Sequence, residues 1–316
     1  MTDKIKLGIS SCLLGENVRY DGGHKLNRYL RDVAGQFVEW VPVCPEAECG
    51  LPIPRESMRL VHSPDGPRLM TRRSKIDHTG LMMKWTAVRL RQIEKERLCG
   101  FVFKAKSPSS GMRDINIYNS KGMPQSKGSG LFAQAFMDRF PLFPVEDEGR
   151  LNDAGIRDNF IERVFVYHRW QNFIEAGAAR KGLVDFHTNH KLLIMAHSPK
   201  HLRLLGKLVA APHQHGKSQL TRHYVTALME GLRLKATAKK NVNVLQHIMG
   251  YFKKQLTPGE KKEMLRVIEQ YHASLIPLIV PVTLLNHYVC KYDEPYLKRQ
   301  HYLNPHPAEL MLRNHV

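Results

Sequence analysis

The sequence predicts an α/β, Rossmann-like parallel sheet in the N-terminal domain and an all-α C-terminal domain. Two observations predict the sheet: short apolar runs that end abruptly in turns, and stretches of helical periodicity between them. Strands that alternate with helical crossovers of this length form parallel sheets, because each crossover returns the chain to the same end of the sheet. A third observation predicts the helical domain, because helical periodicity continues almost unbroken after residue 155.

Three apolar runs are each followed by a turn that contains cysteine, glutamate or serine. The runs and their turns are residues 5–10 with 11–15, residues 37–43 with 44–46, and residues 100–103 with 104–112. In an open α/β sheet, ligands collect beyond the carboxyl ends of the strands. We therefore expect the three turns to converge on one pocket.

Weaker patterns predict the rest of the N-terminal half. Apolar side chains at positions 26, 29, 30, 33 and 34 share one helical face, which predicts a helix over residues 24–36. The other expected elements are helices over 79–97 and 131–139 and strands over 115–118 and 142–145. Residues 120–130 form a Lys-Gly-Ser-rich loop that either covers the pocket, contacts phosphate or is simply solvated. Its glycines do not follow a strand as a dinucleotide-binding turn requires.

An acidic, glycine-containing stretch over residues 146–155 marks the predicted boundary between domains 1–150 and 151–316. Pro258 suits the first turn of a helix, and Pro281 predicts a kink or break. The expected helices of the second domain are residues 156–176, 179–195, 198–211, 217–238, 241–254, 258–273, 275–290 and 307–313.

Five cysteines in 316 residues are too few and too scattered for a disulfide framework. Cys99 and Cys290 lie in apolar surroundings and are expected to pack as small hydrophobes, whereas Cys12 and Cys44 follow strands and are better placed as ligands or catalytic thiols. The longest apolar run, residues 275–285, is shorter than the roughly 20 residues of a membrane span. Because residues 1–6 also lack a signal-peptide pattern, we expect a cytoplasmic protein without a membrane partner; no protein partner is identifiable.

The chain is strongly basic. Its 48 Lys and Arg outweigh 29 Asp and Glu, which gives a net charge of +19 and a pI of 9.8. Residues 151–316 hold 24 basic and 12 acidic residues, so the second domain carries +12 and the first +7. A pI above about 9 is typical of domains that bind polyanions. The charge therefore predicts an RNA or DNA partner.

Several motifs in the first half resemble the thiouracil desulfurase (TudS-like) family. They are Ser-Ser-Cys-Leu-Leu-Gly (10–15), Val-Arg-Tyr-Asp-Gly-Gly-His-Lys (18–25), Val-Pro-Val-Cys-Pro-Glu (41–46), Gly-Leu (50–51), Pro-Arg (54–55), Arg-Leu (59–60) and Lys-Ser-Pro-Ser-x-Gly (106–111). The resemblance covers roughly residues 1–150. It implies an iron-sulfur enzyme that removes sulfur from thiolated pyrimidines without net redox chemistry.

The same resemblance implies roles for residues in the three turns. Cys12 and Cys44 correspond to two ligands of a [4Fe-4S] cluster, Glu46 to a general base and Ser107 to a second catalytic residue. A cluster held by three cysteines leaves one iron open, and a soft open site suits the sulfur of a thiocarbonyl group. The stretch after the first turn is expected to contact substrate, together with Ser109; its residues are Arg19, Tyr20, His24 and Lys25. Arg19 and Tyr20 are alternatively braces of the loop.

The sequence departs from the family pattern at Ser110, where the third cluster cysteine is expected. A serine hydroxyl is a poor ligand for a soft metal, so the cluster is expected to be labile or absent. Two explanations stay open: a deliberate Cys-to-Ser change that traps an inactive form, which we favour, or a natural variant in which Cys49 is the substitute ligand.

The second half resembles the YbgA family over roughly residues 160–316. The matching stretches are Leu-Val-x-Phe-His-x-x-His-Lys-Leu (183–192), Met-Ala-His-Ser (195–198) and Gln-x-Tyr-Leu-x-Pro-His-Pro-x-Glu-Leu (300–310). The two-domain arrangement is similar to that of RNA desulfidases (RudS-like), which convert 4-thiouridine in tRNA to uridine, and tRNA is therefore the expected partner. The alternatives are a desulfurase of free thiouracil, with the helical domain used for oligomerisation, and a non-catalytic RNA-binding protein with a decayed site.

Histidines and lysines of the second half offer further candidates. His187 and His190 have the spacing of a metal-binding pair on a helix, but no third ligand follows at a recognisable distance. RNA contact and ordinary packing are the other interpretations for these two, for Lys191 and for His197. A phosphate-facing surface is expected from the following lysines, each of which is alternatively only solvated: Lys235, Lys239, Lys240, Lys253, Lys254, Lys261 and Lys262.

Overall fold

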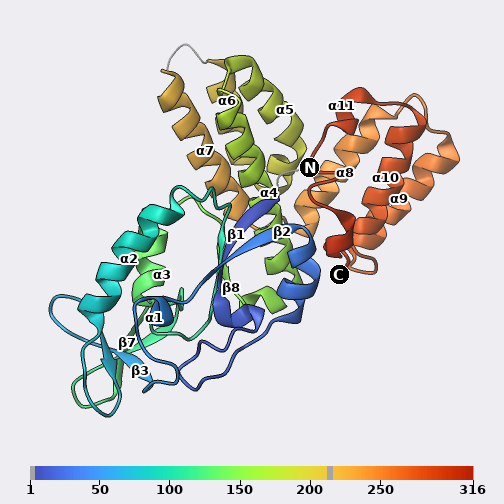
Figure 1. Cartoon of the computed structure of the whole chain (residues 1–316). Helices are drawn as coiled ribbons and strands as arrows, with labels where there is room; N and C mark the ends of the chain where they lie inside the picture. The colour runs from blue at the N-terminus through green and yellow to red at the C-terminus, as the bar shows by residue number, and fades with distance from the viewer. Residues whose placement is uncertain (1–3, 212–215, 316) are drawn as a thin grey trace. The chain divides into compact units, whose positions relative to one another are not determined.

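The computed structural model describes residues 4–211 and 216–315 (Figure 1). The chain divides into two compact units, residues 1–152 and residues 153–316. The division falls two residues after the boundary expected from the acidic stretch. Residues 1–3 of the charged start of the chain lie outside the described residues. Within the described part of the chain, every helix is too short or too polar to cross a membrane.

A four-stranded sheet organises the N-terminal unit, and all of its neighbouring strands are parallel. In the order β2-β1-β5-β8, its strands are Val38–Val43, Ile5–Ser10, Phe101–Phe103 and Val145–Asp147. This arrangement confirms the predicted fold class. The last strand begins where the expected strand over 142–145 ends, because residues 145–147 are the ones that pair in register with β5.

Strand β1 lies between β2 and β5. The chain therefore passes from β1 to β2 on one side and returns later to β5 on the other side. Ser10 pairs with Val43 at the end of β2, and Ile9 pairs with Val102 of β5. The three strands therefore end at one edge of the sheet. A crevice forms at such a point because the connections leave β1 in opposite directions.

Phenylalanines pack one face of this sheet against two helices. Phe101 and Phe103 stack with ring centroids 4.4 Å apart, and Phe136 meets Phe103 edge to face at 5.5 Å. The helices are α2 (Thr79–Ile93) and α3 (Leu131–Arg139), which lie side by side (Figure 1). Helix α2 ends four residues before the predicted residue 97, whereas α3 has the predicted bounds.

A second sheet has the order β4-β3-β6-β7 and was not predicted. Its strands are Arg68–Thr71, Met58–Val61, Ile115–Tyr118 and Pro124–Gly128. The expected loop over residues 120–130 is wrong, because β7 pairs with β6 as an antiparallel hairpin. Periodicity failed here because these strands are short and β7 is almost wholly exposed and polar.

The helix expected over residues 24–36 is also wrong. Only a single π-helical turn, Tyr29–Val33, and a 3-10 turn, Ala34–Gln36, form there. The backbone N–H groups of Lys25 and Asn27 instead donate to the carbonyl groups of Cys12 and Leu13. Hydrogen bonds to the first turn thus replace those of a helix.

The C-terminal unit is helical, as predicted. Its helices are α4 (Ala154–Glu175), α5 (Arg180–His197), α6 (Pro199–Ala210), α7 (Lys217–Arg233), α8 (Ala238–Tyr251), α9 (Pro258–His272), α10 (Ile279–Lys291) and α11 (Pro295–Lys298). Helices α5, α6 and α7 pack together, as do α8, α9 and α10 (Figure 1).

Differences from the expected helices are confined to ends and short turns. Pro281 lies in the first turn of α10, where a missing N–H group costs no intrahelical bond, so it neither kinks nor breaks this helix. The helix expected over 307–313 is only a 3-10 turn, Ala308–Leu310, because Met311 and Arg313 adopt positive φ angles. The short helix α11 was not predicted.

The close packing of β1 on β5 generates a stability prediction. A Cβ atom at Gly8 would lie 2.2 Å from Cδ2 of Phe101, whereas one at Gly80 in α2 meets nothing within 4 Å. Gly8→Ala should therefore lower the free energy of unfolding by about 1–3 kcal/mol, the usual cost of overpacking. Urea denaturation measures this, with Gly80→Ala as the matched control. Equal stability of the two variants would contradict the packing.

Candidate functional site

The turns after β1, β2 and β5 do converge, and they line a cavity of about 440 Å³ in the N-terminal unit. The side chains expected to act in catalysis or metal binding come together here from these three turns. Those in the lining are Cys12, Cys44, Glu46, Ser107 and Ser110. The common strand edge thus brings together residues that are up to 98 positions apart in the sequence.

Cys12 and Cys44 are buried in this lining. Cys12 lies in the 3-10 turn Ser11–Leu14, and Cys44 precedes the first residue of the short helix α1 (Pro45–Glu48). Burial is the main cause that raises the pKa of Cys12 to about 11 and the pKa of Cys44 to about 12, and the Glu46 carboxylate contributes to both increases. Both side chains are therefore neutral thiols at pH 7 unless a bound cation stabilises the thiolates.

Ser110 occupies the third position expected of a cluster ligand, at the wall of the same cavity. Its side chain is buried, and its hydroxyl lies 3.4 Å from that of Ser109. Cys49 does not line the cavity: its thiol donates to the carbonyl of Glu46 at 3.3 Å, and the side chain packs in the core beside the second sheet. The structure therefore gives no support to Cys49 as a substitute ligand.

Two thiols and one hydroxyl do not fit a cluster site built from three thiolates. Fe–S clusters are held by cysteine thiolates, and a neutral hydroxyl binds a soft metal weakly. Among residues 4–211 and 216–315, no group of three His, Cys, Asp or Glu is arranged to hold a metal ion. The donor set is thus incomplete at Ser110.

Glu46 is the centre of a hydrogen-bond network with two serines. The Ser109 hydroxyl donates to Oε1 of Glu46 at 2.6 Å, and the Ser107 hydroxyl donates to the same oxygen at 3.3 Å. The other oxygen, Oε2, accepts from the Cys44 thiol at 3.8 Å. These donors fix the carboxylate in an orientation suited to accepting a proton. Ser109 is fully buried and contacts Glu46 instead of lining the cavity.

The serine turn is held in place by the start of α3. The backbone N–H of Gly130 donates to the carbonyl of Gly111 at 2.7 Å, and that of Ala133 to the carbonyl of Ser109 at 3.1 Å. A Cβ atom at Gly130 would lie 2.5 Å from the carbonyl carbon of Ser109, so only glycine permits this approach. The turn is consequently positioned by backbone contacts that do not depend on the residue at 110.

The residues expected to contact substrate divide into two groups. Arg19, Tyr20 and Lys25 line the cavity, although Arg19 also pairs with Asp21 at 3.3 Å and lies over the Tyr20 ring at 5.4 Å. His24 does not line it: Nδ1 of His24 accepts the backbone N–H of Leu26 at 3.2 Å. His24 therefore braces the loop.

Further cations in the lining were not singled out as site residues from the sequence. They are Arg55, Arg72, Lys104 and Lys106. Both terminal nitrogens of Arg55 donate to the carbonyl of Val18, which ties it to the loop after β1, and Lys104 pairs with Glu148. Arg55, Lys104 and Lys106 lie within or beside the quoted motifs. Arg72 had no sequence signal, because only the second sheet brings it to the cavity.

The conspicuous histidines of the C-terminal unit are buried and bonded to different partners. His187 lies 3.0 Å from the Tyr224 hydroxyl, whereas His190 bonds to the Phe186 carbonyl at 2.7 Å and accepts from Arg169 at 3.1 Å. Burial, together with a smaller effect of the Lys191 charge, lowers the pKa of His187 to about 4. These contacts match the packing interpretation of the pair and give no metal site.

Comparisons with known proteins match different parts of the chain. Residues 7–148 match the family model described as 2-thiouracil desulfurase, and residues 191–307 match that of a protein family of unknown function (DUF1722). The uncharacterised protein YbgA of Escherichia coli K12 is 30% identical over 158 residues, which cover 50% of this chain and 94% of YbgA. A solved structure of a [4Fe-4S]-dependent thiouracil desulfidase, TudS, is similar at 28% identity and a TM-score of 0.38, over 48% of this chain and 95% of that one.

The buried histidines generate a pH prediction. In the unfolded chain His187 takes up a proton near pH 6.5, but in the folded protein it does so only near pH 4. The unfolded state then binds more protons, so the free energy of unfolding should be highest above pH 6.5 and fall as the pH drops toward 4. Urea denaturation between pH 8 and pH 4 measures the slope. His187→Gln should reduce that slope, while His190 and His301, whose pKa values are also lowered, maintain part of it. An unchanged slope would be inconsistent with a neutral, buried His187.

Proposed function

This chain joins a thiouracil desulfurase-like domain to a YbgA-like domain and belongs to the YbgA family, and from that premise we propose that it removes sulfur from 4-thiouridine in tRNA. The observation that carries the proposal is the cavity at the ends of β1, β2 and β5, where two cysteines, a hydrogen-bonded glutamate and several cations meet. The products are uridine and sulfide. The reaction replaces C=S by C=O with water and needs no external electrons.

The residues of the cavity suit the proton transfers of this reaction. Water adds to the carbon of the C=S group and gives one proton to Glu46. Glu46 then returns that proton to sulfur as the C–S bond breaks, so that sulfur leaves as hydrosulfide, and the second proton of the water is released to solvent as the C=O bond forms. Ser107 and Ser109 hold Oε1 of Glu46 and keep the carboxylate facing the cavity. A carboxylate with two hydroxyl donors is oriented before substrate arrives, which lowers the cost of reaching the transition state.

An iron-sulfur cluster would supply a soft site for the departing sulfur, and Cys12 and Cys44 are placed to hold part of one. Because Ser110 completes the set with a hydroxyl, we assign no step to a cluster in this chain. We instead propose that Ser110 makes the protein a weak or inactive form of the desulfidase.

The charge of the cavity supports a substrate that carries phosphate. Six cationic side chains line it against one acidic side chain, Glu46; the six are Arg19, Lys25, Arg55, Arg72, Lys104 and Lys106. Lys104 is paired with Glu148 and Arg19 with Asp21, but the other four cations outnumber Glu46 and leave the cavity positive. A free thiouracil is neutral and gains little from such charge, whereas a nucleotide in RNA brings its phosphates with it.

A base in tRNA must leave its stack to reach a cavity of this kind. Enzymes that modify bases accept an exposed or flipped nucleotide in a pocket and hold the backbone with cations. About 440 Å³ lies within the usual 300–1,000 Å³ range of ligand pockets. The charge of +12 on residues 151–316 supports RNA as the larger partner.

Ser110 favours one other function, a protein that binds thiolated tRNA without changing it. In that case the cavity retains its cations and its glutamate but lacks the ligand set for sulfur removal. The two functions share a substrate and differ in turnover, so one experiment separates them.

That experiment compares this chain with its Ser110→Cys variant after anaerobic reconstitution with iron and sulfide. The variant should bind iron and remove 4-thiouridine from bulk tRNA at least about a hundredfold faster, the usual scale on which lost catalytic groups act. Adding Cys44→Ser to Ser110→Cys should abolish both properties. The non-catalytic function is correct if both proteins bind tRNA but neither binds iron and neither removes sulfur from the tRNA.

A second prediction concerns the cations. Arg72→Ala should weaken binding of tRNA that contains 4-thiouridine and reduce the slope of log Kd against log salt by about 1, because one phosphate contact is lost. Arg73→Ala is the matched control, since Arg73 is exposed and does not line the cavity. Filter binding between 50 and 300 mM salt measures both variants. Identical slopes would show that the cavity does not contact phosphate.

A further inference from the structure

The positive charge of the C-terminal unit is concentrated in its central helices. Residues 186–259 hold twelve Lys and Arg but a single acidic residue, Glu230, so this segment carries +11. Residues 151–185 and 260–316 together hold twelve Lys and Arg against eleven Asp and Glu, so they are almost neutral. The elements from α5 to α8 are therefore the place to look for a surface that contacts a polyanion.

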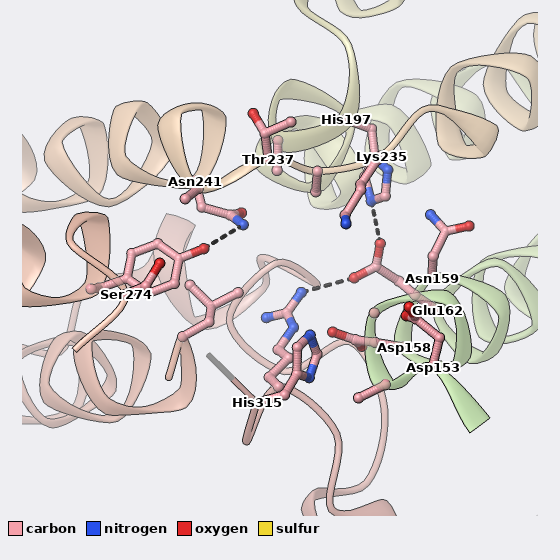
Figure 2. A pocket seen from close by; sticks show the side chains of 18 of the residues that line it. Asp153, Asp158, Asn159, Glu162, His197, Lys235, Thr237, Asn241, Ser274 and His315 are labelled. Atoms are coloured by element: carbon pink, nitrogen blue, oxygen red, sulfur yellow. Dashed lines mark hydrogen bonds and ion pairs between the residues drawn. The ribbon is translucent and has the colours of Figure 1, made fainter. Parts of the chain in front are cut away.

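A cavity of about 540 Å³ in this unit does not account for that charge, because acids and cations line it together (Figure 2). Glu162 is buried and bonds to His197 at 2.5 Å and to Arg313 at 2.8 Å. Nδ1 of His197 also lies 2.7 Å from the carbonyl of Leu234. Among the other lining side chains are Asp153, Asp158 and Lys235. A polyanion would meet carboxylates here as well as cations.

Helix α6 carries three cations on one exposed face. Lys200, Arg203 and Lys207 are three and four residues apart, so they share one side of the helix. All three are exposed, and at about 1.5 Å per residue they extend over about 10 Å of the helix axis. Among residues 4–211 and 216–315, no Asp or Glu pairs with any of them; Nε of Arg203 donates to the carbonyl of Pro199 at 3.4 Å. Their charges are therefore available to an outside partner.

The opposite face of α6 is buried, which fixes the direction in which these cations point. Leu205 is fully buried, and α6 packs against α5 and α7 (Figure 1). A Cβ atom at Gly231 of α7 would lie 2.9 Å from Cβ of His201, so the two helices approach closely. Helix α7 presents two further exposed cations in its first two turns, Lys217 and Arg222.

The buried face also decides between two kinds of polyanion. A basic amphipathic helix can bind an anionic membrane, but it then inserts its apolar face into the lipid. In α6 that face packs inside the unit, and Leu204, at 45%, is the one large apolar side chain exposed on this helix. The face that remains is cationic and hydrophilic, which suits a nucleic-acid backbone.

Helix α9 shows that a similar number of cations need not give a positive surface. It holds three Lys and Arg and three Glu, so these charges cancel. Its cations are Lys261, Lys262 and Arg266, and its acids are Glu260, Glu263 and Glu269. The phosphate contacts expected of the two lysines gain no support from this arrangement, and the helix is a matched control for α6.

We propose that the exposed face of α6, formed by Lys200, Arg203 and Lys207, binds the sugar–phosphate backbone of tRNA. Each cation contacts phosphate, and the face positions the RNA without reading its bases, as backbone contacts do in general. The choice of tRNA among nucleic acids rests on the proposed function.

Filter binding of bulk tRNA to the whole chain tests the proposal. A variant that combines Lys200→Ala, Arg203→Ala and Lys207→Ala should bind at least about a hundredfold more weakly at 0.1 M salt, because three phosphate contacts are lost. The slope of log Kd against log salt should fall by about 2–3 for the same reason.

The matched control combines Lys261→Ala, Lys262→Ala and Arg266→Ala. It removes the same net charge from α9, and because salt screens charges that do not contact the RNA, it should change Kd by no more than about threefold. Equal weakening by the two triple variants overturns the proposal, as does an α6 variant that binds like the unchanged chain. Thermal unfolding checks that each variant is folded, and Gln in place of Ala on α6 repeats the test if the first variant is unstable.

Sedimentation with vesicles of phosphatidylcholine and phosphatidylglycerol tests the membrane alternative. The unchanged chain should stay in the supernatant, because α6 has no apolar face to insert. Vesicle binding that the α6 substitutions abolish, together with tRNA binding that they leave intact, would assign this face to a membrane and overturn the proposal.

The binding assay needs no turnover, so its result is separate from that of the proposed function. In the Ser110→Cys protein reconstituted with iron and sulfide, the α6 substitutions should raise KM for tRNA and leave kcat unchanged. Absence of turnover in the Ser110→Cys protein rejects the proposed desulfuration alone. Turnover with KM and Kd both unchanged by the α6 substitutions rejects this inference alone.

Discussion

The parallel pairing of β1 with both β2 and β5 is the constraint on which the N-terminal unit depends. It requires Gly8, because any side chain there would collide with the Phe101 ring, and it brings three strand ends to one edge. Cys12, Glu46 and Ser107 meet for this reason, although their local turns differ in form. A slip of one residue in this register would reverse the side chains of a strand and separate them.

The two cavities differ in the charges of the side chains that line them. The N-terminal cavity surrounds one glutamate with cations, which is the basis of the polyanionic substrate proposed above. The C-terminal cavity is lined by acidic and basic side chains together, among them Asp153, Asp158, Lys235 and Arg313. Glu162 shows how burial is tolerated there: burial raises its pKa, but the charges of His197 and Arg313 outweigh that effect and hold the pKa below its usual range.

At Ser110, the backbone contacts that hold the turn are separate from the side chain that would bind a metal. Backbone hydrogen bonds from the start of α3 hold the serine turn, and none of them involves the side chain at position 110. The exchange of a sulfur ligand for a hydroxyl can thus leave the fold intact while it removes a strong metal ligand. The network of Glu46 with Ser107 and Ser109 extends to this position, because the Ser110 hydroxyl lies 3.4 Å from that of Ser109.

The sequence by itself determined the fold class, the helices of the second unit and the cluster of reactive turns, because apolar runs and helical periodicity are local signals with long, repeated patterns. Only the tertiary structure decided the short elements and the contacts between residues far apart in the sequence. Residues 24–36 lost their helix to hydrogen bonds with the turn at Cys12, β7 became a strand by pairing with β6, and Arg72 reached the cavity through the second sheet. The partners of His197 also lie 35 and 37 positions away, beyond any sequence period. Such contacts depend on the positions of segments that are distant in the sequence, and local sequence patterns do not determine those positions.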